Sequence, residues 1–360
     1  MQAVNFFPTA KLNMFSGYGK LETGLLGGLL EAGVQVHGSG MGMSPAELRK
    51  YPRQYQDALT RMMREEMEAD VVIVTALPKN CDGWHSLLGK RVWLYTMSES
   101  TQVSKKWVRQ INRWCEGVFV PCAPLVEVYR ASGVSVPIVD VGMGVDYCVP
   151  TVAADPVPAD DKFIFMSYSY GDMRKGAHKA ILAFKKLYGD NPRFELWIKA
   201  RGAENTWLAA CEDEQIKIIN KKLSERGWFD LLSQVDAFVF PSYGEGFGLP
   251  PREATLAHVP TLATRWLGLW DVECWGLPIE TGRHLPAQFT YAEANSRKAE
   301  WVEPDEQSLE QQMQWVVDNY AEAMAQAKVG RDYLLVNFTW KRTAQRMMEA
   351  IYGTHHTTVT

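Results

Sequence analysis

The chain of 360 residues lacks the short patterns that bind metals or cross-link small domains. Its six cysteines include no C-x-x-C pair, its seven histidines include no H-x-x-x-H spacing, and no D-x-D sequence is present. These absences argue against a zinc site, a disulfide framework and a catalytic metal. We therefore expect no metal and no resident cofactor, and a reducing, cytoplasmic setting.

Long hydrophobic runs and a strong excess of one charge are also missing. No stretch approaches the ~18 apolar residues of a membrane span, and the first residues, MQAVNFFPTAKLNMF, lack a basic leader followed by an apolar segment. A formal net charge of −4 argues against a surface built throughout for nucleic acid or anionic lipid. We expect a soluble protein without a transmembrane segment. Peripheral contact with a membrane is compatible with these features.

Short apolar runs instead alternate with amphipathic stretches, in two series separated by a segment rich in Pro, Ala and Asp. This alternation is typical of βα units, and a chain of this length with 46% hydrophobic residues can bury two cores. We predict an α/β fold of two Rossmann-like, doubly wound domains with a ligand in the cleft between them. The predicted parts are an N-terminal domain (1–150), a linker (151–161), a C-terminal domain (162–337) and a closing helix with tail (338–360).

The candidate strands are short runs rich in β-branched and aromatic residues. In the first series they are 3–7, 34–38, 70–76, 91–96, 117–121 and 136–141. In the second series they are 162–169, 193–200, 215–220, 236–242 and 259–264.

The most informative segment is DAFVFPSYGEGFGLPPREATLAHVPTLAT, residues 236–264, which places Glu245 and Glu253 around a Gly-rich turn. Glycines let the backbone approach a ligand, and Pro250 and Pro251 suit the first turn of a helix, whose free amides favour a phosphate. We expect Glu253 in that exposed first turn, where a carboxylate can accept hydrogen bonds from ribose hydroxyls. Taken alone, either glutamate is better explained as a capping or solvated residue, but the ordered combination of strand, Glu, Gly-Phe-Gly, double Pro and second Glu is much rarer.

The run GEGFGLPPREA resembles the signature of retaining, family-4-type glycosyltransferases of the GT-B fold. The resemblance implies two Rossmann-like domains that face a central cleft, with a C-terminal helix crossing back to the N-terminal domain. It also implies that the N-terminal domain lies on the acceptor side and that the C-terminal domain binds the nucleotide sugar. By matching position, Glu245 lies near the donor sugar and Glu253 binds the ribose. The predicted donor-binding residues are Gly17, Gly19, Arg174, Lys175, Glu245, Gly246, Phe247, Gly248, Leu249 and Glu253.

Candidate residues to neutralise the charge of a diphosphate lie in the segment SYGDMRKGAHKAILAFKKL. In the family a strand ends in Gly-Arg and a Lys-Gly follows at a helix start. Here Lys175-Gly176 matches the Lys-Gly, so the resemblance implies that Lys175 contacts phosphate. The Arg position is a departure, since Ser169 or Tyr170 occupies it. Candidate substitutes for that cation are Arg174 and Arg201.

Two features of the N-terminal half remain ambiguous. Ser16-Gly17-Tyr18-Gly19 precedes an amphipathic stretch, so its amides suit a phosphate, although an isolated G-x-G is usually a turn. Glu99 stands where the family often has a His near the donor sugar. It is a candidate for contact with donor or acceptor hydroxyls, or for capping a helix that begins near Ser104.

Two helices are expected from their patterns. The run KKWVRQINRW, residues 105–114, carries four basic residues at helical spacing opposite Trp107, Val108, Ile111 and Trp114, which we predict to be buried. The basic face is either a solvated surface or an attraction for an anionic acceptor, lipid headgroup or nucleic acid. The run NFTWKRTAQRMMEAIYG resembles the closing helix of GT-B enzymes, and otherwise is a plain amphipathic helix.

The resemblance therefore implies a retaining hexosyltransferase, with Lys175, Glu245 and Glu99 as candidate catalytic residues. Metal independence is expected because D-x-D and His clusters are absent, while Lys175 and a helix N-terminus are present to neutralise the diphosphate. The expected substrate is a UDP- or GDP-sugar, and the expected acceptor is a hydroxyl of a saccharide or glycolipid. Alternatives are a hydroxymethylated base in DNA as acceptor, a phosphorylase or synthase of the same fold, and a nucleotide-sugar-binding module without turnover.

Overall fold

The computed structural model divides the chain into two compact units. Unit 1 comprises Met1–Met97, Gln102–Tyr147 and Phe338–Thr360, and unit 2 comprises Ser98–Thr101 and Cys148–Asn337. The structure describes residues 2–8, 16–38, 49, 53, 56–57, 60, 69–78, 87, 89–146, 149–150, 162–170, 173–201, 206–289, 296 and 298–353. The predicted linker, 151–161, and the last residues of the predicted tail, 354–360, lie outside the described residues.

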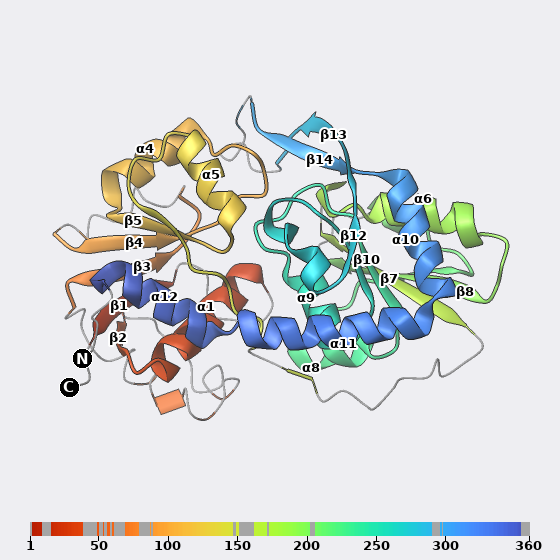
Figure 1. Cartoon of the computed structure of the whole chain (residues 1–360), viewed down its shortest axis with the longest axis horizontal. Coiled ribbons are helices and arrows are strands. Elements are labelled where there is room, and N and C mark those ends of the chain that lie inside the picture. Colours follow the sequence, from red (N-terminus) through yellow and green to blue (C-terminus); the bar gives the residue numbers. More distant parts are fainter. Residues whose placement is uncertain are drawn as a thin grey trace. The chain divides into compact units, whose positions relative to one another are not determined.

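Unit 1 is built on a parallel sheet with strand order β2-β1-β3-β4-β5-β6. Its central strands are short, fully buried and rich in valine, as expected for a sheet covered on both faces. Figure 1 shows α4 and α5 on one side of this sheet and α1 and α12 on the other. The strands are β1 (Ala3–Pro8), β2 (Gln35–Gly38), β3 (Val71–Thr75), β4 (Arg91–Tyr95), β5 (Gly117–Val120) and β6 (Ile138–Asp140). The helices are α1 (Gly17–Glu31), α4 (Lys105–Trp114), α5 (Ala123–Ala131) and α12 (Trp340–Tyr352).

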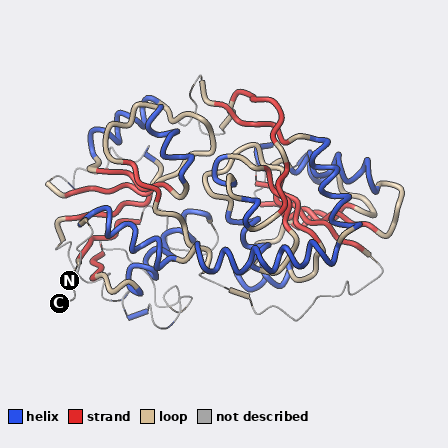
Figure 2. Tube along the Cα trace, viewed as in Figure 1, coloured by secondary structure: helices blue, strands red, loops and turns tan. Residues whose placement is uncertain are grey.

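Unit 2 repeats this architecture with a second parallel sheet, ordered β12-β11-β10-β7-β8-β9 (Figure 2). Its strands are β7 (Phe163–Tyr170), β8 (Phe194–Arg201), β9 (Ile216–Ile219), β10 (Ala237–Phe240), β11 (Thr261–Thr264) and β12 (Leu277–Ile279). Its helices are α6 (Ala177–Tyr188), α7 (Thr206–Ala209), α8 (Glu225–Leu232), α9 (Leu249–Leu256), α10 (Glu306–Asp318) and α11 (Tyr320–Asn337). Short 3-10 turns are η2 (Met173–Lys175), η3 (Leu267–Leu269) and η4 (Val272–Cys274).

The order of the strands in unit 2 locates a binding edge. From β7 the chain first builds outward through β8 and β9, and then returns to the other side of β7 to build β10, β11 and β12. Ligands of doubly wound sheets bind outside the carboxyl ends of the strands at such a reversal. The segments that leave β7 and β10 therefore flank the expected binding position.

A small antiparallel hairpin in unit 2 was not predicted. Strand β13 (Thr281–Pro286) pairs with β14 (Glu300–Pro304), and β12 was also missed. The hairpin is tied to the short unit 2 segment 98–101, because Thr101 N donates to Glu300 O at 3.1 Å. Its strands carry Gly, Pro and charged residues and are largely exposed on β13, so they lack the apolar alternation on which strand prediction depends.

The predicted closing helix is α12, which belongs to unit 1. Thr339 caps it by accepting a hydrogen bond from Arg342 N, and Trp340 N donates to Asp146 Oδ1 at 2.8 Å. The glycines of α1 allow the two helices to approach closely. A Cβ at Gly24 would lie within 2.0 Å of the Trp340 ring, so a larger residue there would displace α12.

Candidate active site

The loop after β10 and the start of α9 form one wall of the binding edge. Gly248 is the N-cap of α9 at φ +80°, and a Cβ on it would lie 2.3 Å from the Leu269 side chain. Only glycine tolerates both the left-handed backbone and this contact. Leu249 begins the helix and the two prolines occupy its first turn, as predicted. Pro250 and Pro251 have no N–H, so the donors that this helix start offers to an anion are the amides of Gly248 and Leu249.

The segment after β7 approaches this loop closely. Gly176 has φ +73°, and a Cβ on it would lie 1.8 Å from Pro241 O, so the position requires glycine. Tyr243 N donates to Arg174 O at 2.8 Å. These contacts place the side chains of the 3-10 turn η2 beside the Gly-rich loop.

Four side chains meet there in a buried ionic cluster. Lys175 Nζ lies 2.7 Å and 2.8 Å from the two carboxylate oxygens of Glu245. Arg174 Nη1 donates to Glu245 Oε1 at 3.0 Å and to Gly244 O at 2.6 Å, and Ser242 Oγ donates to Glu245 Oε1 at 2.8 Å. Arg174, Lys175 and Glu245 are each less than 10% exposed. The structure therefore brings together three residues that the sequence suggested separately.

Glu99 joins the edge of this cluster. Its carboxylate lies 3.6 Å from Arg174 Nη2, and its side chain is about a quarter exposed. The backbone at Glu99 is also close to the loop, because a Cβ on Gly244 would lie 2.1 Å from Glu99 O. The alternative role as a helix cap is wrong, since Ser104 caps α4 by accepting from Trp107 N.

The electrostatics of the cluster favour an ionised carboxylate. Burial raises the pKa of Glu245, but the charges of Lys175 and Arg174 and the hydrogen bonds from Lys175 and Ser242 outweigh it, so the pKa lies below its usual value. Burial lowers the pKa of Lys175. The positive charge of Arg174 lowers this pKa further, whereas the negative charge of Glu245 raises it. The site thus holds concentrated charge in a low-dielectric setting, where electrostatic interactions are strong.

Glu253 differs from the prediction in both position and exposure. It lies in the second turn of α9, is 2% exposed, and accepts a hydrogen bond from Trp228 Nε1 at 2.7 Å through Oε2. The expectation of an exposed first-turn carboxylate is therefore wrong. The donor, Trp228, stands on α8 and no local pattern linked it to Glu253. The effect of the hydrogen bond is to fix the direction of the carboxylate.

A second buried ion pair supports the Gly-rich loop and was missed by sequence reasoning. Arg252 Nη2 lies 2.5 Å from Asp271 Oδ1, with both side chains 1% exposed. The guanidinium stacks between the rings of Phe247 and Trp275, at 4.1 Å and 4.8 Å, and donates to Gly268 O. Arg252 thereby holds Phe247 in place. The only local sign of this ion pair in the sequence was a charged residue next to the two prolines.

The remaining predicted residues lie elsewhere. In unit 1, Ser16 caps α1 by accepting from Gly19 N at 3.0 Å, and no described residue outside this first turn lies within 4 Å of the position of a Cβ on Gly17. In unit 2, Arg201 lies over the Tyr170 ring at 5.5 Å, whereas Arg174, the other candidate substitute cation, contacts Glu245.

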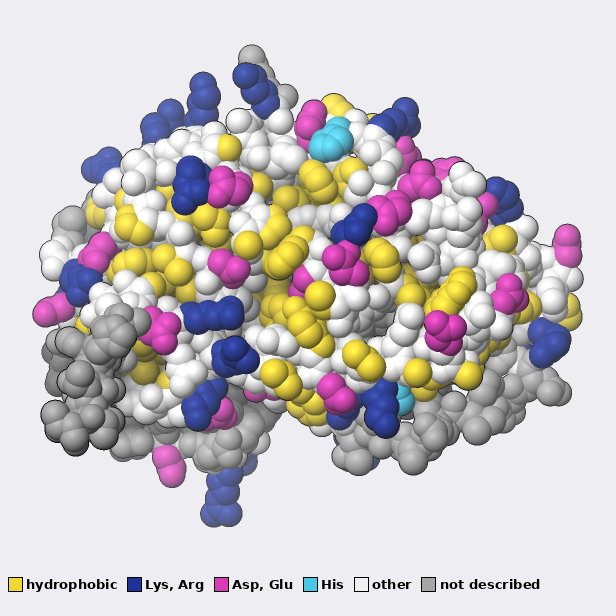
Figure 3. All heavy atoms as spheres, viewed as in Figure 1, with side chains coloured by type: hydrophobic (Ala, Val, Ile, Leu, Met, Phe, Trp, Pro, Cys, Tyr) yellow, Lys and Arg dark blue, Asp and Glu magenta, His cyan; other side chains and the backbone are white. Residues whose placement is uncertain are grey.

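The basic helix forms as α4, and Trp107, Val108 and Ile111 are buried. Trp114 is only partly buried, which corrects the prediction for it, and Arg113 lies 5.2 Å above its ring. On the face drawn in Figure 3, side chains of both charges are interspersed. Such mixing is typical of a solvated surface rather than of a single-sign field.

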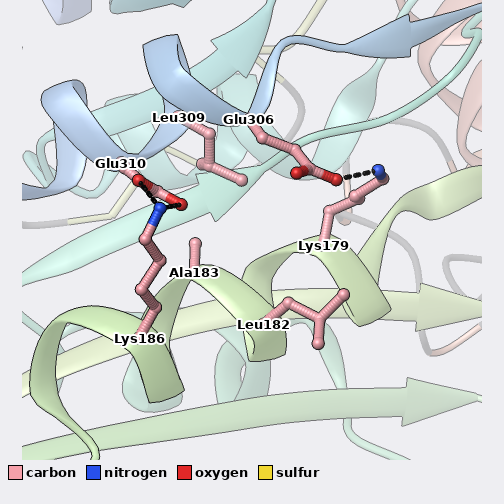
Figure 4. A pocket seen from close by; sticks show the side chains of 7 residues that line it. All are labelled: Lys179, Leu182, Ala183, Lys186, Glu306, Leu309 and Glu310. Atoms are coloured by element: carbon pink, nitrogen blue, oxygen red, sulfur yellow. Dashed lines mark hydrogen bonds and ion pairs between the residues drawn. The ribbon is translucent and has the colours of Figure 1, made fainter.

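The structure also contains a hollow of about 320 Å³ between α6 and α10. Figure 4 shows the side chains of the two helices directed toward one another, with Lys179 paired to Glu306 and Lys186 to Glu310. Leu182, Ala183 and Leu309 complete the lining. This hollow is crossed by satisfied ion pairs, and we attribute it to helix packing.

Within the described residues, no group of three or more His, Cys, Asp or Glu side chains is arranged to bind a metal. In that same part of the chain, every helix is too short or too polar to cross a bilayer.

Comparison with known proteins identifies relatives of this architecture. Two glycogen synthases of Mycobacterium tuberculosis are 26% identical over 178 residues, which is 48% of this chain and 38% of the synthases. The chain thus matches well under half the length of these curated relatives. Among solved structures, sucrose-phosphate synthase from Thermosynechococcus elongatus superposes with a TM-score of 0.69 at 17% identity, covering 98% of both chains.

The Anabaena protein HepE in complex with UDP-glucose superposes with a TM-score of 0.63 at 12% identity, covering 98% of this chain and all of the other. These likenesses confirm the predicted GT-B fold. Residues 127–347, more than half of the chain, match the family described as family 4 glycosyltransferase in conflict systems. With that match covering both the Gly-rich loop and the start of α12, the chain belongs to this glycosyltransferase family.

Proposed function

We propose that the protein transfers a sugar from a nucleotide-sugar donor to a hydroxyl acceptor, with retention and without a metal. The observation that carries the proposal is the buried cluster of Arg174, Lys175 and Glu245 at the strand-order reversal, next to the N-terminus of α9. A diphosphate needs cations and directed amides around it, and this edge supplies both.

In the proposed complex, the diphosphate lies between Lys175, Arg174 and the backbone amides of Gly248 and Leu249 at the start of α9. An ammonium has three N–H donors. Lys175 directs hydrogen bonds to both oxygens of Glu245, which leaves one N–H for a phosphate oxygen. Glu245 then accepts hydrogen bonds from hydroxyls of the donor sugar, and Glu253 accepts from the ribose.

The proposed reaction is a front-face substitution through an oxocarbenium-like state. The bond between the anomeric carbon and the leaving phosphate oxygen breaks, the acceptor oxygen bonds to the same face, and the departing diphosphate takes the acceptor proton. Lys175 and Arg174 stabilise the charge that grows on the leaving group. Glu99, paired with Arg174, is placed to position a donor or acceptor hydroxyl.

The donor is proposed to be a UDP- or GDP-sugar. UDP-glucose in the HepE complex and UDP-2-fluoro glucose in the E. coli trehalose-6-phosphate structure, TM-score 0.66, support a uridine nucleotide on a fold of this kind. The acceptor is proposed to be a saccharide or glycolipid hydroxyl. The scattered cysteines favour a reducing, cytoplasmic setting, which stays a prediction.

A donor panel tests the proposal. The full chain is incubated with UDP- and GDP-sugars and a mixture of saccharide and glycolipid acceptors, and products are followed by mass spectrometry. We expect release of a nucleoside diphosphate together with one glycosylated product, and a matched Glu245→Gln protein should be impaired. Tight nucleotide-sugar binding without release or transfer would instead identify a binding module.

Two further measurements address the mechanism. Full activity in excess EDTA is expected, whereas activity restored only by Mg²⁺ or Mn²⁺ would refute metal independence. Proton NMR of the first product from an α-linked donor should show an α linkage. A β linkage would refute retention.

A further inference from the structure

Lys199 is a buried lysine that the proposed chemistry does not use. It stands near the carboxyl end of β8 and is 7% exposed. Within the described part of the chain, its ammonium hydrogen-bonds only Ala200 O, at 2.6 Å. Burial lowers the pKa of Lys199, and the charge of Arg201 lowers it further. An ammonium with three donors is therefore held in the protein with one neutral acceptor.

The other buried lysines that the structure describes in unit 2 show how unusual that is. Lys175 lies 2.7 Å from Glu245, and Lys179 lies 2.7 Å from Glu303. Burying a charge without a compensating partner costs free energy, so such a group is normally paired. The spare donors of Lys199 indicate a ligand that carries acceptor oxygens.

The face on which Lys199 lies is set by strand alternation. Leu196, Ile198 and Ala200 belong to the core formed with α6 and α10, so Lys199 faces the opposite side. On that side Tyr168 of β7 is its direct neighbour in the sheet register. The Tyr168 ring packs edge-on against Trp228, with centroids 6.1 Å apart.

Trp228 connects this group to the donor site, because its Nε1 donates to Glu253. A row therefore runs from Glu253 through Trp228 and Tyr168 to Lys199. In a nucleoside diphosphate the ribose lies between the diphosphate and the base. If Glu253 binds the ribose and Lys175 binds the diphosphate, the base is expected at the other end of this row, beside Tyr168 and Lys199.

The chemistry of lysine then restricts the base. An ammonium donates and cannot accept, so it matches the carbonyl oxygens of uracil and guanine. Adenine and cytosine present an amino donor at the equivalent position. Resting on the donor site proposed above, we propose that Lys199 recognises the carbonyl oxygen of a keto base in the nucleotide donor and selects against adenine.

Calorimetric titration of the full chain with UDP, GDP and ADP tests the proposal. The wild type should bind UDP or GDP about 10- to 100-fold more tightly than ADP, the range for one hydrogen bond to a charged group. Lys199→Met should lose most of that preference, with ADP affinity changed less than about twofold. Its melting temperature should be equal to or above that of the wild type, since an apolar side chain replaces a desolvated charge.

Lys217→Met is the matched control, because Lys217 lies on the adjacent strand, opposite Trp197 on the same face, and is paired with Glu195. It should keep the wild-type base preference. Equal losses for UDP, GDP and ADP in Lys199→Met would mean a phosphate contact and would overturn base recognition. No loss, or a wild type that prefers ADP, would also overturn it while leaving the nucleotide site intact. A wild type that binds none of the three would overturn the donor site itself.

Discussion

The two units share a six-stranded parallel architecture but differ in what they bury. Among the described residues of unit 1, the buried Asp, Glu, Lys, Arg and His side chains are Glu22 and His37. The corresponding groups of unit 2 are Arg174, Lys175, Lys179, Glu195, Lys199, Asp236, Glu245, Arg252, Glu253, His258 and Asp271. Several of these gather where the strand order reverses. Since hydrophobic burial alone could stabilise either sheet, we attribute the charges of Arg174 and Lys175 at this reversal to the diphosphate proposed above.

Two kinds of buried ionic group occur within unit 2. Arg252 and Asp271 pair one positive with one negative charge, and Arg252 contacts the Gly-rich loop through the Phe247 ring. Arg174 and Lys175 bring two positive charges to Glu245 at the strand-order reversal, and Glu99 lies at the edge of this group. We infer that the first pair is structural and that the second group is completed by a diphosphate.

The largest expected effect is on stability, at the compensated pair. Asp271→Ala should lower the free energy of unfolding by about 3–5 kcal/mol, because it leaves the guanidinium of Arg252 buried without its partner. Urea unfolding measures this. In unit 1, Glu22→Gln should cost only about 0.5–1.5 kcal/mol, since glutamine keeps an acceptor for the hydrogen bond from Thr75 Oγ1 at 2.8 Å. Equal losses of unfolding free energy in Asp271→Ala and Glu22→Gln would contradict the proposed difference between the two units.

The next effect is on turnover. Lys175→Ala should reduce kcat at saturating donor by about 100-fold or more, because the lysine stabilises charge on the leaving group. Lys106→Ala, on the exposed face of α4 in unit 1, should leave kcat within about twofold. An unchanged kcat with a raised KM for Lys175→Ala would show that the lysine binds ground and transition states equally.

A smaller effect is expected at the ribose carboxylate. Glu253→Gln keeps an acceptor for Trp228 but removes the charge, so it should weaken nucleoside diphosphate binding by about 1–3 kcal/mol. Trp228→Phe should weaken binding less, because the carboxylate remains but is no longer held in one direction. Calorimetry on proteins with unchanged melting temperatures measures both. Wild-type affinity in Glu253→Gln would contradict the ribose assignment.

The smallest effect concerns pH. Burial, with a contribution from Lys179, lowers the pKa of His178 to about 4 from 6.5. The unfolded chain therefore binds a proton at this residue between pH 6.5 and 4 while the folded chain does not, and stability falls as pH decreases through that window. His178→Gln should show a shallower fall in melting temperature from pH 6.5 to 4. Parallel curves would contradict the assignment.

The sequence predicted the sheets better than the contacts of the site. All eleven predicted strands are present, because buried parallel strands are short apolar runs with clear boundaries. The hairpin β13–β14 was missed because its residues are mixed in polarity. Lys175 and Glu245 were each suggested by their local motifs, but their pairing was not, since they are 70 residues apart. Sequence patterns report local periodicity, whereas ion pairs depend on tertiary packing.

The same limit explains the error at Glu253. Its place in the motif was recognised, yet its burial depends on Trp228, which is 25 residues away on another helix. Arg252 and Asp271 were missed for the same reason, being 19 residues apart. Motif spacing therefore located the binding edge, while the orientation of each charged group required the structure.

Hydrogen exchange followed by mass spectrometry tests the central claim most directly, that the carboxyl edge of the unit 2 sheet binds the nucleotide sugar. The full chain is compared with and without a saturating UDP-sugar or GDP-sugar that calorimetry shows to bind. Slower exchange is expected in the η2 segment around Gly176 and in the loop and helix start from 243 to 249, where the account places amides against the ligand. Unchanged exchange in both segments, with ligand bound, would contradict the account.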